Sequence, residues 1–344
     1  MMFSIIIPTR DRAPSLKRTL ESLLSLEELG VDREILVVDN GSRDDTSALV
    51  AAIQERNHPY PIRYFLEPVP GLLSGRHRGA LEARGDICIY LDDDVRLGSR
   101  WLSAISDAFR DPAVHLVGGP SRPLFESAPP PWLDGFFSES EEGRHCIWLS
   151  LIDGGGAVRE IDPCYVWGLN YAIRKESLLR FGGFHPDTAP KALHRFQGDG
   201  ETGLSLSLKE AGAKALYHPE AEVLHEVPDE RLTEVYFAAR GFFEGVAQSY
   251  TEIRRTGKSS APVLGKPMQE LHRLFSKAWD GILGRRKGIR DLAALHLERG
   301  YAFHQREVWR DPTLLEWVMR KDYWDYRLPT LKNGSRSLPE WKAS

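Results

Sequence analysis

Four apolar runs, each ending in polar residues, lie in the first hundred residues of the chain. They are FSIIIPT (3–9), REILVVDNGS (33–42), IRYFLEP (62–68) and DICIYLDDD (86–94). Continuous apolar runs of this length predict strands that are buried on both faces of a sheet. The segments that separate them have apolar residues at helical spacing: 13–26, 44–56 and 72–85. This alternation predicts an α/β fold with a mostly parallel sheet flanked by helices.

The alternation weakens after residue 103. A strand is predicted at 115–125, and a strand followed by a short helix at 164–184. The segment 126–145 between them is rich in Pro, Ser and Glu, which predicts a mobile surface loop. A helix and then a strand that carries two histidines are predicted at 198–227.

Helical patterns dominate from about residue 230 to residue 323. This change of pattern predicts a boundary between residues 228 and 240. We therefore expect an α/β domain at 1–230 and a mainly helical C-terminal region at 231–344, which would make acceptor, membrane-surface or dimer contacts.

The composition is that of an ordinary soluble globular protein. The 344-residue chain has a formal net charge of −4, which does not indicate a nucleic-acid-binding protein. The three cysteines, Cys88, Cys146 and Cys164, have no CxxC spacing, which is typical of a reducing compartment. No run of about 18 apolar residues occurs. We expect a cytoplasmic protein that is soluble or, at most, peripheral to a membrane.

Three adjacent carboxylates, Asp92, Asp93 and Asp94, follow the fourth predicted strand. The carboxyl ends of parallel strands meet at one edge of a sheet, where α/β proteins bind ligands. Adjacent carboxylates repel each other unless a cation accepts their oxygens. Alternation along an extended strand places Asp92 and Asp94 on one side, so these two predict a Mg²⁺ or Mn²⁺ site. The alternative is that the acids only begin the next helix, whose dipole favours them.

Four sequence blocks occur in a fixed order along the chain. They are FSIIIPTRDRAPSLKRTLESLL, EILVVDNGSRDDT, GLLSGRHRGALEARGDICIYLDDDVRL and GLNYAIRKESLLRFGGF. Together they resemble the family 2 glycosyltransferases over about residues 3–228. The resemblance implies the GT-A fold, which is Rossmann-like, and an inverting enzyme that transfers a sugar from a nucleoside-diphosphate sugar, here expected to be a UDP-sugar, to an acceptor hydroxyl.

The strand ends and the resemblance together predict a nucleotide-binding set. Its members are Pro8, Thr9, Arg10, Asp39, Asn40, Ser42, Arg76, Asp92 and Asp93. Arg76 would contact the base or a phosphate, although His77 follows it where the family has Asn.

The resemblance also implies a metal site with Mn²⁺ or Mg²⁺ as the cofactor. At the family's DxD position, Asp94 would bind the metal directly and Asp92 would hold the ribose or a metal-bound water. His225, which follows the last predicted strand, would complete the site. The alternative for His225 is a structural role.

The block GDGETGLSLSLKEAG (198–212) resembles the family segment that carries the catalytic acid. Alignment places Glu201 at that position, as the base that takes the proton of the acceptor hydroxyl. The adjacent acid of the family is missing, because Gly200 stands in its place, and Asp199 is the alternative base. Without the resemblance, these acids would only indicate the first turn of a helix.

The block VWGLNYAIRKE (166–176) supplies Trp167, Gly168 and Asn170. The resemblance places these residues beside the donor sugar and the acceptor, with Trp167 as a stacking wall and Asn170 as a polar contact. The alternative is that Trp167 is an aromatic residue of the core.

Basic residues accumulate between residues 254 and 290. They predict either a solvated face or a peripheral contact with an anionic membrane surface, which would suit a lipid-linked acceptor. The later segment 314–329 has apolar residues at helical spacing and predicts a homodimer contact or a lid on the cleft. The expected partners are a nucleoside-diphosphate sugar donor and a saccharide, lipid-linked or small-molecule acceptor.

Two other functions agree with part of the sequence. One is a non-catalytic protein that binds nucleotide sugars as a scaffold, which the missing acid at Gly200 favours. The other is a sugar-phosphate nucleotidyltransferase, which would need a glycine-rich phosphate loop after the first strand. The sequence IPTRDRAPS has no such loop there.

Overall fold

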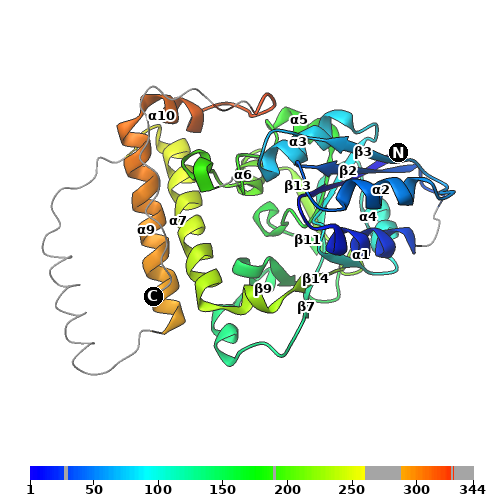
Figure 1. The fold of residues 1–344 in the computed structure, drawn as a ribbon, viewed down its shortest axis with the longest axis horizontal. Helices are drawn as coiled ribbons and strands as arrows, with labels where there is room; N and C mark the ends of the chain where they lie inside the picture. Colours follow the sequence, from blue (N-terminus) through cyan, green and yellow to red (C-terminus); the bar gives the residue numbers. More distant parts are fainter. Residues whose placement is uncertain (27–29, 189–190, 260–287, 327, 329–344) are drawn as a thin grey trace, which may run out of the picture.

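The computed structural model describes residues 1–26, 30–188, 191–259, 288–326 and 328. Figure 1 shows an α/β body with a pair of long helices beside it. The predicted membrane contact of the basic segment 254–290 lies largely outside the described residues.

The first part of the chain forms the predicted alternation of strands and helices. The strands are β1 (Phe3–Thr9), β2 (Arg33–Asp39), β3 (Ile62–Leu66) and β4 (Ile87–Leu91). The helices are α1 (Ala13–Leu24), α2 (Thr46–Gln54), α3 (Leu72–Glu82) and α4 (Trp101–Ala108). β1 lies between β2 and β4 and pairs with both in parallel, so the prediction of a parallel sheet in this part is confirmed.

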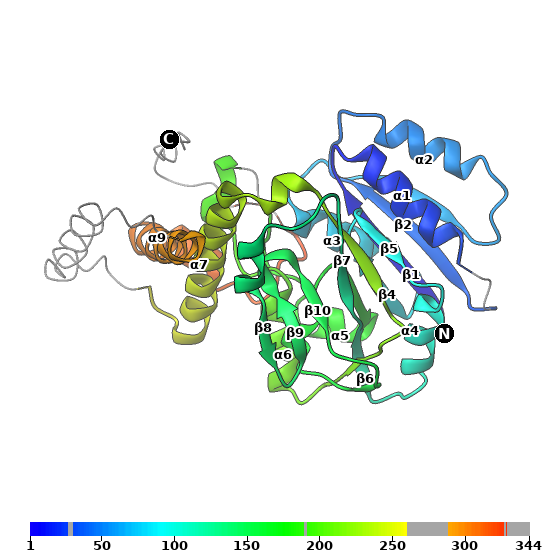
Figure 2. The same ribbon diagram turned by 90° about the horizontal axis from the view of Figure 1, so that it is seen from below.

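The strands β1, β2 and β4 are buried along their whole length. Side chains alternate between two cores, because successive residues of a strand point to opposite faces. Ile5 belongs to the core that includes Leu16 of α1, whereas Ile6 belongs to the core that includes Ala80 of α3. Figure 2 shows α1 and α2 at one end of the molecule and the helices α7 and α9, which follow later in the chain, at the other.

Four further strands extend this sheet beyond β4. They are β12 (Asn170–Arg174), β6 (Val114–Gly118), β13 (Lys214–Tyr217) and β11 (Arg159–Glu160), in the order β11-β13-β6-β12-β4-β1-β2-β3. β12 pairs antiparallel with β4 and β6, whereas β13 pairs parallel with β6. The associated helices are α5 (Lys175–Arg180) and α6 (Glu201–Glu210).

A second sheet packs beside the first. Its strands in order are β5 (Val95–Leu97), β14 (Val223–Val227), β7 (Ser121–Phe125), β10 (Leu151–Asp153), β9 (Gly143–Cys146) and β8 (Ser138–Ser140). The segment 115–125, predicted as one strand, therefore forms parts of two strands in different sheets. Gly119 allows this crossing, because a Cβ atom there would lie 2.1 Å from the carbonyl oxygen of Ala221.

The prediction of a mobile loop at 126–145 is wrong. The segment holds the 3₁₀ helix η1 (Pro131–Phe136) as well as β8 and β9. Leu133 is buried, and the rings of Phe136 and Phe237 pack with their centroids 4.5 Å apart. A few apolar anchors thus order a segment whose overall composition is typical of a loop.

The C-terminal region is helical, as predicted. It contains α7 (Glu234–Thr256), α9 (Ile289–Arg310) and α10 (Pro312–Val318), and the remaining 3₁₀ helices of the chain are η2 (Ile147–Leu149), η3 (Pro163–Tyr165), η4 (Lys191–Phe196) and η5 (Asp229–Leu232). α7 and α9 lie side by side in both views (Figures 1 and 2), and a Cβ atom at Gly300 would lie 1.8 Å from Phe242 O. Within the described ranges, no helix has both the length and the hydrophobicity needed to span a membrane.

After α10 the chain returns to the α/β body and contacts α3. His77 is fully buried there. Its Nδ1 donates a hydrogen bond to Tyr323 O (3.1 Å), its Nε2 accepts one from Phe184 N–H (2.9 Å), and its ring stacks on Trp324 at 4.2 Å. Burial lowers the pKa of His77 to about 3. The residue that departs from the family pattern therefore joins α3 to the C-terminal segment.

Candidate functional site

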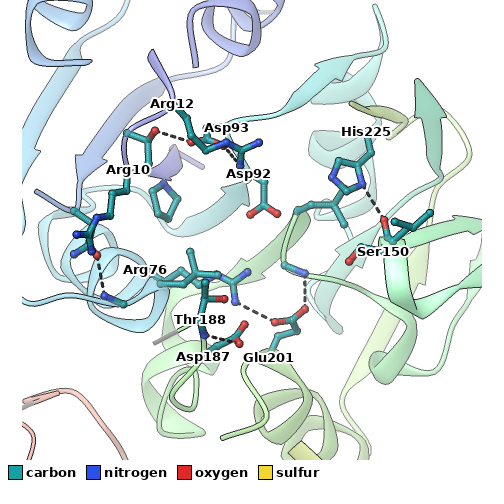
Figure 3. A pocket seen from close by; sticks show the side chains of 18 of the residues that line it. Arg10, Arg12, Arg76, Asp92, Asp93, Ser150, Asp187, Thr188, Glu201 and His225 are labelled. Carbon is teal, nitrogen blue, oxygen red and sulfur yellow. Dashed lines mark hydrogen bonds and ion pairs between the residues drawn. The ribbon is translucent and has the colours of Figure 1, made fainter. Parts of the chain in front are cut away.

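A cavity of about 500 Å³ lies at the carboxyl ends of β1, β2 and β4. The described wall contains five arginines, from the β1–α1 loop, α3, η5 and α7: Arg10, Arg12, Arg76, Arg231 and Arg240. Its acidic residues are Asp92, Asp93, Asp187 and Glu201. Figure 3 shows Arg12, Asp92 and Asp93 on one side of the cavity and Arg76, Asp187 and Glu201 on the opposite side. Guanidinium groups suit the oxygens of phosphate or carboxylate ligands.

The three aspartates after β4 face different partners. The strand ends at Leu91, and Asp93 and Asp94 lie in a turn, so the alternation expected for an extended strand does not apply to them. Asp92 extends into the cavity (Figure 3), where burial and the nearby Asp94 raise its pKa.

Asp93 is held beneath the cavity by two groups of the β1–α1 region. Thr9 Oγ1 donates a hydrogen bond to Asp93 Oδ2 at 2.6 Å, and Arg12 Nη1 lies 2.7 Å from Asp93 Oδ1. Burial nevertheless raises the pKa of Asp93 to about 7. The residue fixes the loop after β1 against the loop after β4.

Asp94 is buried behind the wall and meets two arginines. Its Oδ2 lies 2.8 Å from Arg12 Nη2 and 2.7 Å from Arg231 Nη2. Burial alone would raise the pKa of Asp94, but the charges of Arg231 and Arg12 hold it well below its usual range. Its Oδ1 is buried and has no hydrogen-bond partner among the described residues.

His225 is presented to Asp94 by β14. Its Nδ1 donates a hydrogen bond to Leu149 O at 2.9 Å, so its Nε2 carries a lone pair. That lone pair accepts a hydrogen bond from Arg231 Nη1 at 2.8 Å, and Nε2 lies 3.5 Å from Asp94 Oδ2. The imidazole therefore has the tautomer that metal ligation requires.

The donor set fits a divalent cation in part. The unpartnered Asp94 Oδ1, the cavity-facing Asp92 and the lone pair of His225 are all suitable ligands. However, in the part of the chain that the structure describes, no three His, Cys, Asp or Glu side chains are grouped closely enough to hold a metal. Arg12 and Arg231 occupy Asp94 Oδ2 instead, and Arg231 also donates a hydrogen bond to the lone pair of His225. A cation here would need oxygens from a ligand or from water to complete its coordination.

The predicted nucleotide-binding residues separate into two groups. Pro8, Thr9, Arg10, Asn40, Arg76, Asp92 and Asp93 line the cavity. Asp39 and Ser42 do not line it: Asp39 accepts hydrogen bonds from Ser42 N (2.7 Å) and Tyr64 OH (2.7 Å). They shape the loop after β2, next to Asn40.

Glu201 begins α6 and closes the opposite side of the cavity. Its Oε2 accepts a hydrogen bond from Arg76 Nη1 at 3.0 Å, and its Oε1 accepts one from Gly168 N at 3.0 Å. Burial would raise the pKa of Glu201, but the Arg76 charge and the Gly168 amide lower it. A Cβ atom at position 168 would lie 1.9 Å from Arg76 Nη2, so a glycine is required for Arg76 to reach Glu201.

A second cavity of about 210 Å³ adjoins the first and shares with it Ser150, Asp187, Glu201 and Arg240. Trp167 and Asp199 line this side cavity. Asp199 is also tied to the core, because its Oδ1 lies 2.6 Å from His185 Nδ1 and its Oδ2 accepts a hydrogen bond from Thr251 Oγ1 at 2.6 Å.

The structure does not bring Asn170 to either cavity. Its Oδ1 accepts a hydrogen bond from Trp101 Nε1 at 2.9 Å, and its Nδ2 donates one to Ala221 O at 2.8 Å. The side chain is therefore satisfied within the protein, whereas Gly168, two residues earlier, does line the main cavity.

Sequence reasoning missed four charged residues of the wall: Arg12, Asp187, Arg231 and Arg240. Asp187 carried the clearest signal, because it is an acid in the loop that precedes the incomplete acid pair of α6. Arg231 and Arg240 follow the predicted domain boundary at residue 230, which led us to assign them to a separate region. The boundary in fact runs through the cavity wall.

Comparison with known proteins agrees with the resemblance to the family 2 glycosyltransferases. Residues 4–157 match the model of Glycosyl transferase family 2. The chain is 26% identical over 270 residues to a pre-mycofactocin glycosyltransferase of Mycobacterium tuberculosis, which covers 76% of this chain and 50% of the relative. It is 25% identical over 236 residues to the succinoglycan biosynthesis protein ExoM of Rhizobium meliloti, covering 68% of this chain and 70% of the relative.

Among solved structures, the mannosyltransferase PcManGT from Pyrobaculum calidifontis, in complex with GDP-Man and Mn²⁺, superposes with a TM-score of 0.54. The sequence identity is 18%, and the match covers 94% of this chain and 88% of that chain. The fold is therefore that of the GT-A glycosyltransferases. Residues 4–157 are similar to glycosyl transferase family 2, and the chain spans about half the length of the mycobacterial relative.

Proposed function

We propose that the protein is an inverting glycosyltransferase that moves a sugar from a nucleoside-diphosphate sugar to an acceptor hydroxyl. The observation that carries this proposal is the cavity at the strand ends, whose wall holds five arginines together with Asp92, Asp187 and Glu201. Such a wall combines cations for a diphosphate with carboxylates for proton transfer. The match of residues 4–157 to the family model supports the same reaction class.

The donor's diphosphate would lie between the β1–α1 loop and η5. Arg12 and Arg231 both form ion pairs with Asp94 there, and an arriving diphosphate would compete with Asp94 for these guanidinium groups. Asp94 Oδ1, Asp92 and His225 would hold a Mn²⁺ or Mg²⁺ ion, which when bound neutralises charge on the leaving diphosphate. The Mn²⁺ in the PcManGT complex supports metal use.

The acceptor hydroxyl would approach from the side cavity. Asp187 and Glu201 both line the two cavities, which supports a carboxylate base at their junction. Attack on the anomeric carbon from the face opposite the diphosphate would invert its configuration, while a carboxylate takes the hydroxyl proton. A UDP-sugar remains the first donor to test, with GDP-mannose second because of the PcManGT complex.

A non-catalytic nucleotide-sugar-binding role is the second candidate. The observations that favour it are the missing acid at Gly200 and the two ion pairs that occupy Asp94. Three predictions from the sequence remain proposals. They are a lipid-linked acceptor, a contact of the 254–290 segment with a membrane surface, and a homodimer.

The test is a screen of nucleotide sugars with Mn²⁺, Mg²⁺ or EDTA, in which release of free nucleoside diphosphate is measured with saccharide, lipid-linked and small-molecule acceptors. The proposed function predicts release that EDTA abolishes for at least one donor. Donor binding by calorimetry without release from any donor would favour the scaffold instead.

Asp94→Asn tests the metal site without adding a cavity. We expect the Mn²⁺-dependent part of donor affinity to fall by about tenfold or more, because the substitution removes the carboxylate charge of Asp94 that would bind the metal. Calorimetric titration of UDP with and without Mn²⁺ measures this difference. An unchanged response to Mn²⁺ would remove Asp94 from the metal ligands.

A further inference from the structure

Gly200 precedes α6 and has a φ of +60°, and its missing side chain leaves space that another residue fills. A Cβ atom at position 200 would lie 3.0 Å from Asp187 Oδ2 and 3.2 Å from Asp187 Cγ. The carboxylate of Asp187 therefore stands where a side chain at position 200 would begin. That is the position at which the resemblance leads us to expect an acid beside Glu201.

Asp187 and Glu201 face the same space but have different surroundings. Both line the main cavity and the side cavity, and Figure 3 shows the two carboxylates below Arg76. Each oxygen of Glu201 accepts a hydrogen bond, one from Arg76 and one from Gly168. Glu201 is thus a fixed anion that is already paired with a cation.

Asp187 keeps one oxygen available. Its Oδ1 accepts hydrogen bonds from Thr188 N (2.7 Å) and from Gln197 Nε2 (3.4 Å). Its Oδ2 accepts none from the described residues, and no cation lies within ion-pair distance of it in that part of the chain. The side chain therefore has a lone pair that a ligand hydroxyl in either cavity can reach.

The surroundings of Asp187 also favour proton uptake by its carboxylate. Burial and the neighbouring Glu201 raise the pKa of Asp187, and the charges of Arg76 and Arg240 only partly oppose them. The pKa of Glu201 is lowered. A pair of carboxylates whose pKa values are displaced in opposite directions is typical of sites that divide the roles of fixed charge and proton acceptor.

We propose that Asp187 is the general base of the transfer reaction and replaces the acid that is missing at position 200. This inference rests on the proposed function. The bond from the acceptor oxygen to the anomeric carbon forms while the bond from that carbon to the diphosphate oxygen breaks. The nucleoside diphosphate leaves with the electron pair of the broken bond. Asp187 Oδ2 takes the proton of the acceptor hydroxyl, and the Glu201–Arg76 pair holds the wall in place.

The experiment uses water as the acceptor, so that the natural acceptor need not be known. Release of nucleoside diphosphate from UDP-glucose, UDP-N-acetylglucosamine and GDP-mannose is measured with Mn²⁺ for the full chain and for Asp187→Asn, Asp187→Glu and Glu201→Gln. Glu139→Gln in the exposed strand β8 serves as the matched carboxylate control. Donor affinity by calorimetry and the circular dichroism spectrum identify variants that fail to bind or to fold.

We expect Asp187→Asn to lower kcat by about 100-fold or more, as for loss of a general base, with donor affinity within about threefold of wild type. The acidic limb of the profile of kcat against pH should disappear in this variant, and Asp187→Glu should restore part of the rate. Glu201→Gln should keep the acidic limb.

Two results would overturn the assignment while leaving the proposed function intact. One is an Asp187→Asn enzyme that retains kcat within about threefold and keeps its acidic limb; the other is loss of that limb in Glu201→Gln. If the wild type releases nucleotide from none of the donors, with water or with the screened acceptors, the proposed function fails and this inference fails with it.

Discussion

Two glycines give charged side chains their places in this cavity. Gly168 leaves the space through which the buried Arg76 reaches Glu201, and Gly200 leaves the space that the Asp187 carboxylate fills. In each case the functional group and the glycine are far apart in the sequence. A substitution at either glycine should therefore act on a charged partner rather than on its own neighbours in the chain.

Gly168→Ala tests this dependence. The new Cβ atom would lie 1.9 Å from Arg76 Nη2, so we expect Arg76 to shift away from Glu201 and the protein to lose about 1–3 kcal/mol of stability through overpacking. Thermal unfolding measures the loss, and calorimetry should show weaker donor binding. Gly156→Ala is the matched control, because a Cβ atom there meets no atom within 4 Å. Equal unfolding temperatures of the two variants would contradict the prediction.

Individual residues also differ in how well the sequence predicts their place in the site. Asp92 and Glu201 were predicted from the order of strands and from the resemblance, and both line the cavity. Arg12 and Arg231 were not, because their partner Asp94 is brought to them only when β1 pairs with β4 and β14 pairs with β5. Local patterns predict where an acidic residue stands in the chain, but they do not predict which basic side chain pairs with it.

At the scale of elements, α3 connects the wall of the main cavity with the C-terminal segment. Arg76 faces the cavity, and the next residue, His77, faces the core, where it bonds to Tyr323 O and Phe184 N–H. His304 of α9 is a second buried histidine, hydrogen bonded to Ser249 of α7 at 2.8 Å. The contacts of His77 require a neutral imidazole, because one ring nitrogen donates a hydrogen bond and the other accepts one.

These histidines predict acid-sensitive stability. Burial lowers the pKa of His77 to about 3 and that of His304 to about 4, below the value of about 6.5 expected in the unfolded chain. Between these values the unfolded state binds more protons, so the stability contribution is present above pH 6.5 and is lost as pH falls. Each histidine should reduce the free energy of unfolding by up to about 1.4 kcal/mol per pH unit.

The measurement is chemical unfolding between pH 7 and pH 4.5 for the wild type and for His77→Asn. The variant should be less stable at pH 7 but should show a smaller dependence on pH, since one titrating group is removed and the others remain in both proteins. Parallel curves would show that His77 does not titrate in this way.

At the scale of the whole molecule, one core joins the two predicted regions. The cluster that contains Ile6 of β1 and Tyr90 of β4 also contains Tyr250 of α7 and Tyr323 near the C-terminus. The hydroxyl of Tyr323 donates a hydrogen bond to Trp317 O at 2.6 Å. The helical region thus completes the core of the α/β body, in addition to supplying Arg231 and Arg240 to the cavity.

We therefore expect a single cooperative unfolding transition for the full chain. A fragment of residues 1–230 should fail to unfold cooperatively, because it lacks Tyr250, Trp317 and Tyr323 of the shared core. Calorimetry of the full chain and circular dichroism of the fragment measure these outcomes. Two separate transitions, or a fragment that melts cooperatively near the temperature of the full chain, would support independent domains.

The sequence by itself determined the succession of strands and helices, the parallel core of the sheet and the positions of the acids after β4 and at the start of α6. These features depend on local periodicity and on residues that are close in the chain. Only the tertiary structure decided that 115–125 enters two sheets and that 126–145 is anchored by aromatic contacts. It also decided that Arg231 meets Asp94 and that Asp187 fills the space beside Gly200. Each of these contacts joins segments whose meeting depends on packing, which local patterns do not record.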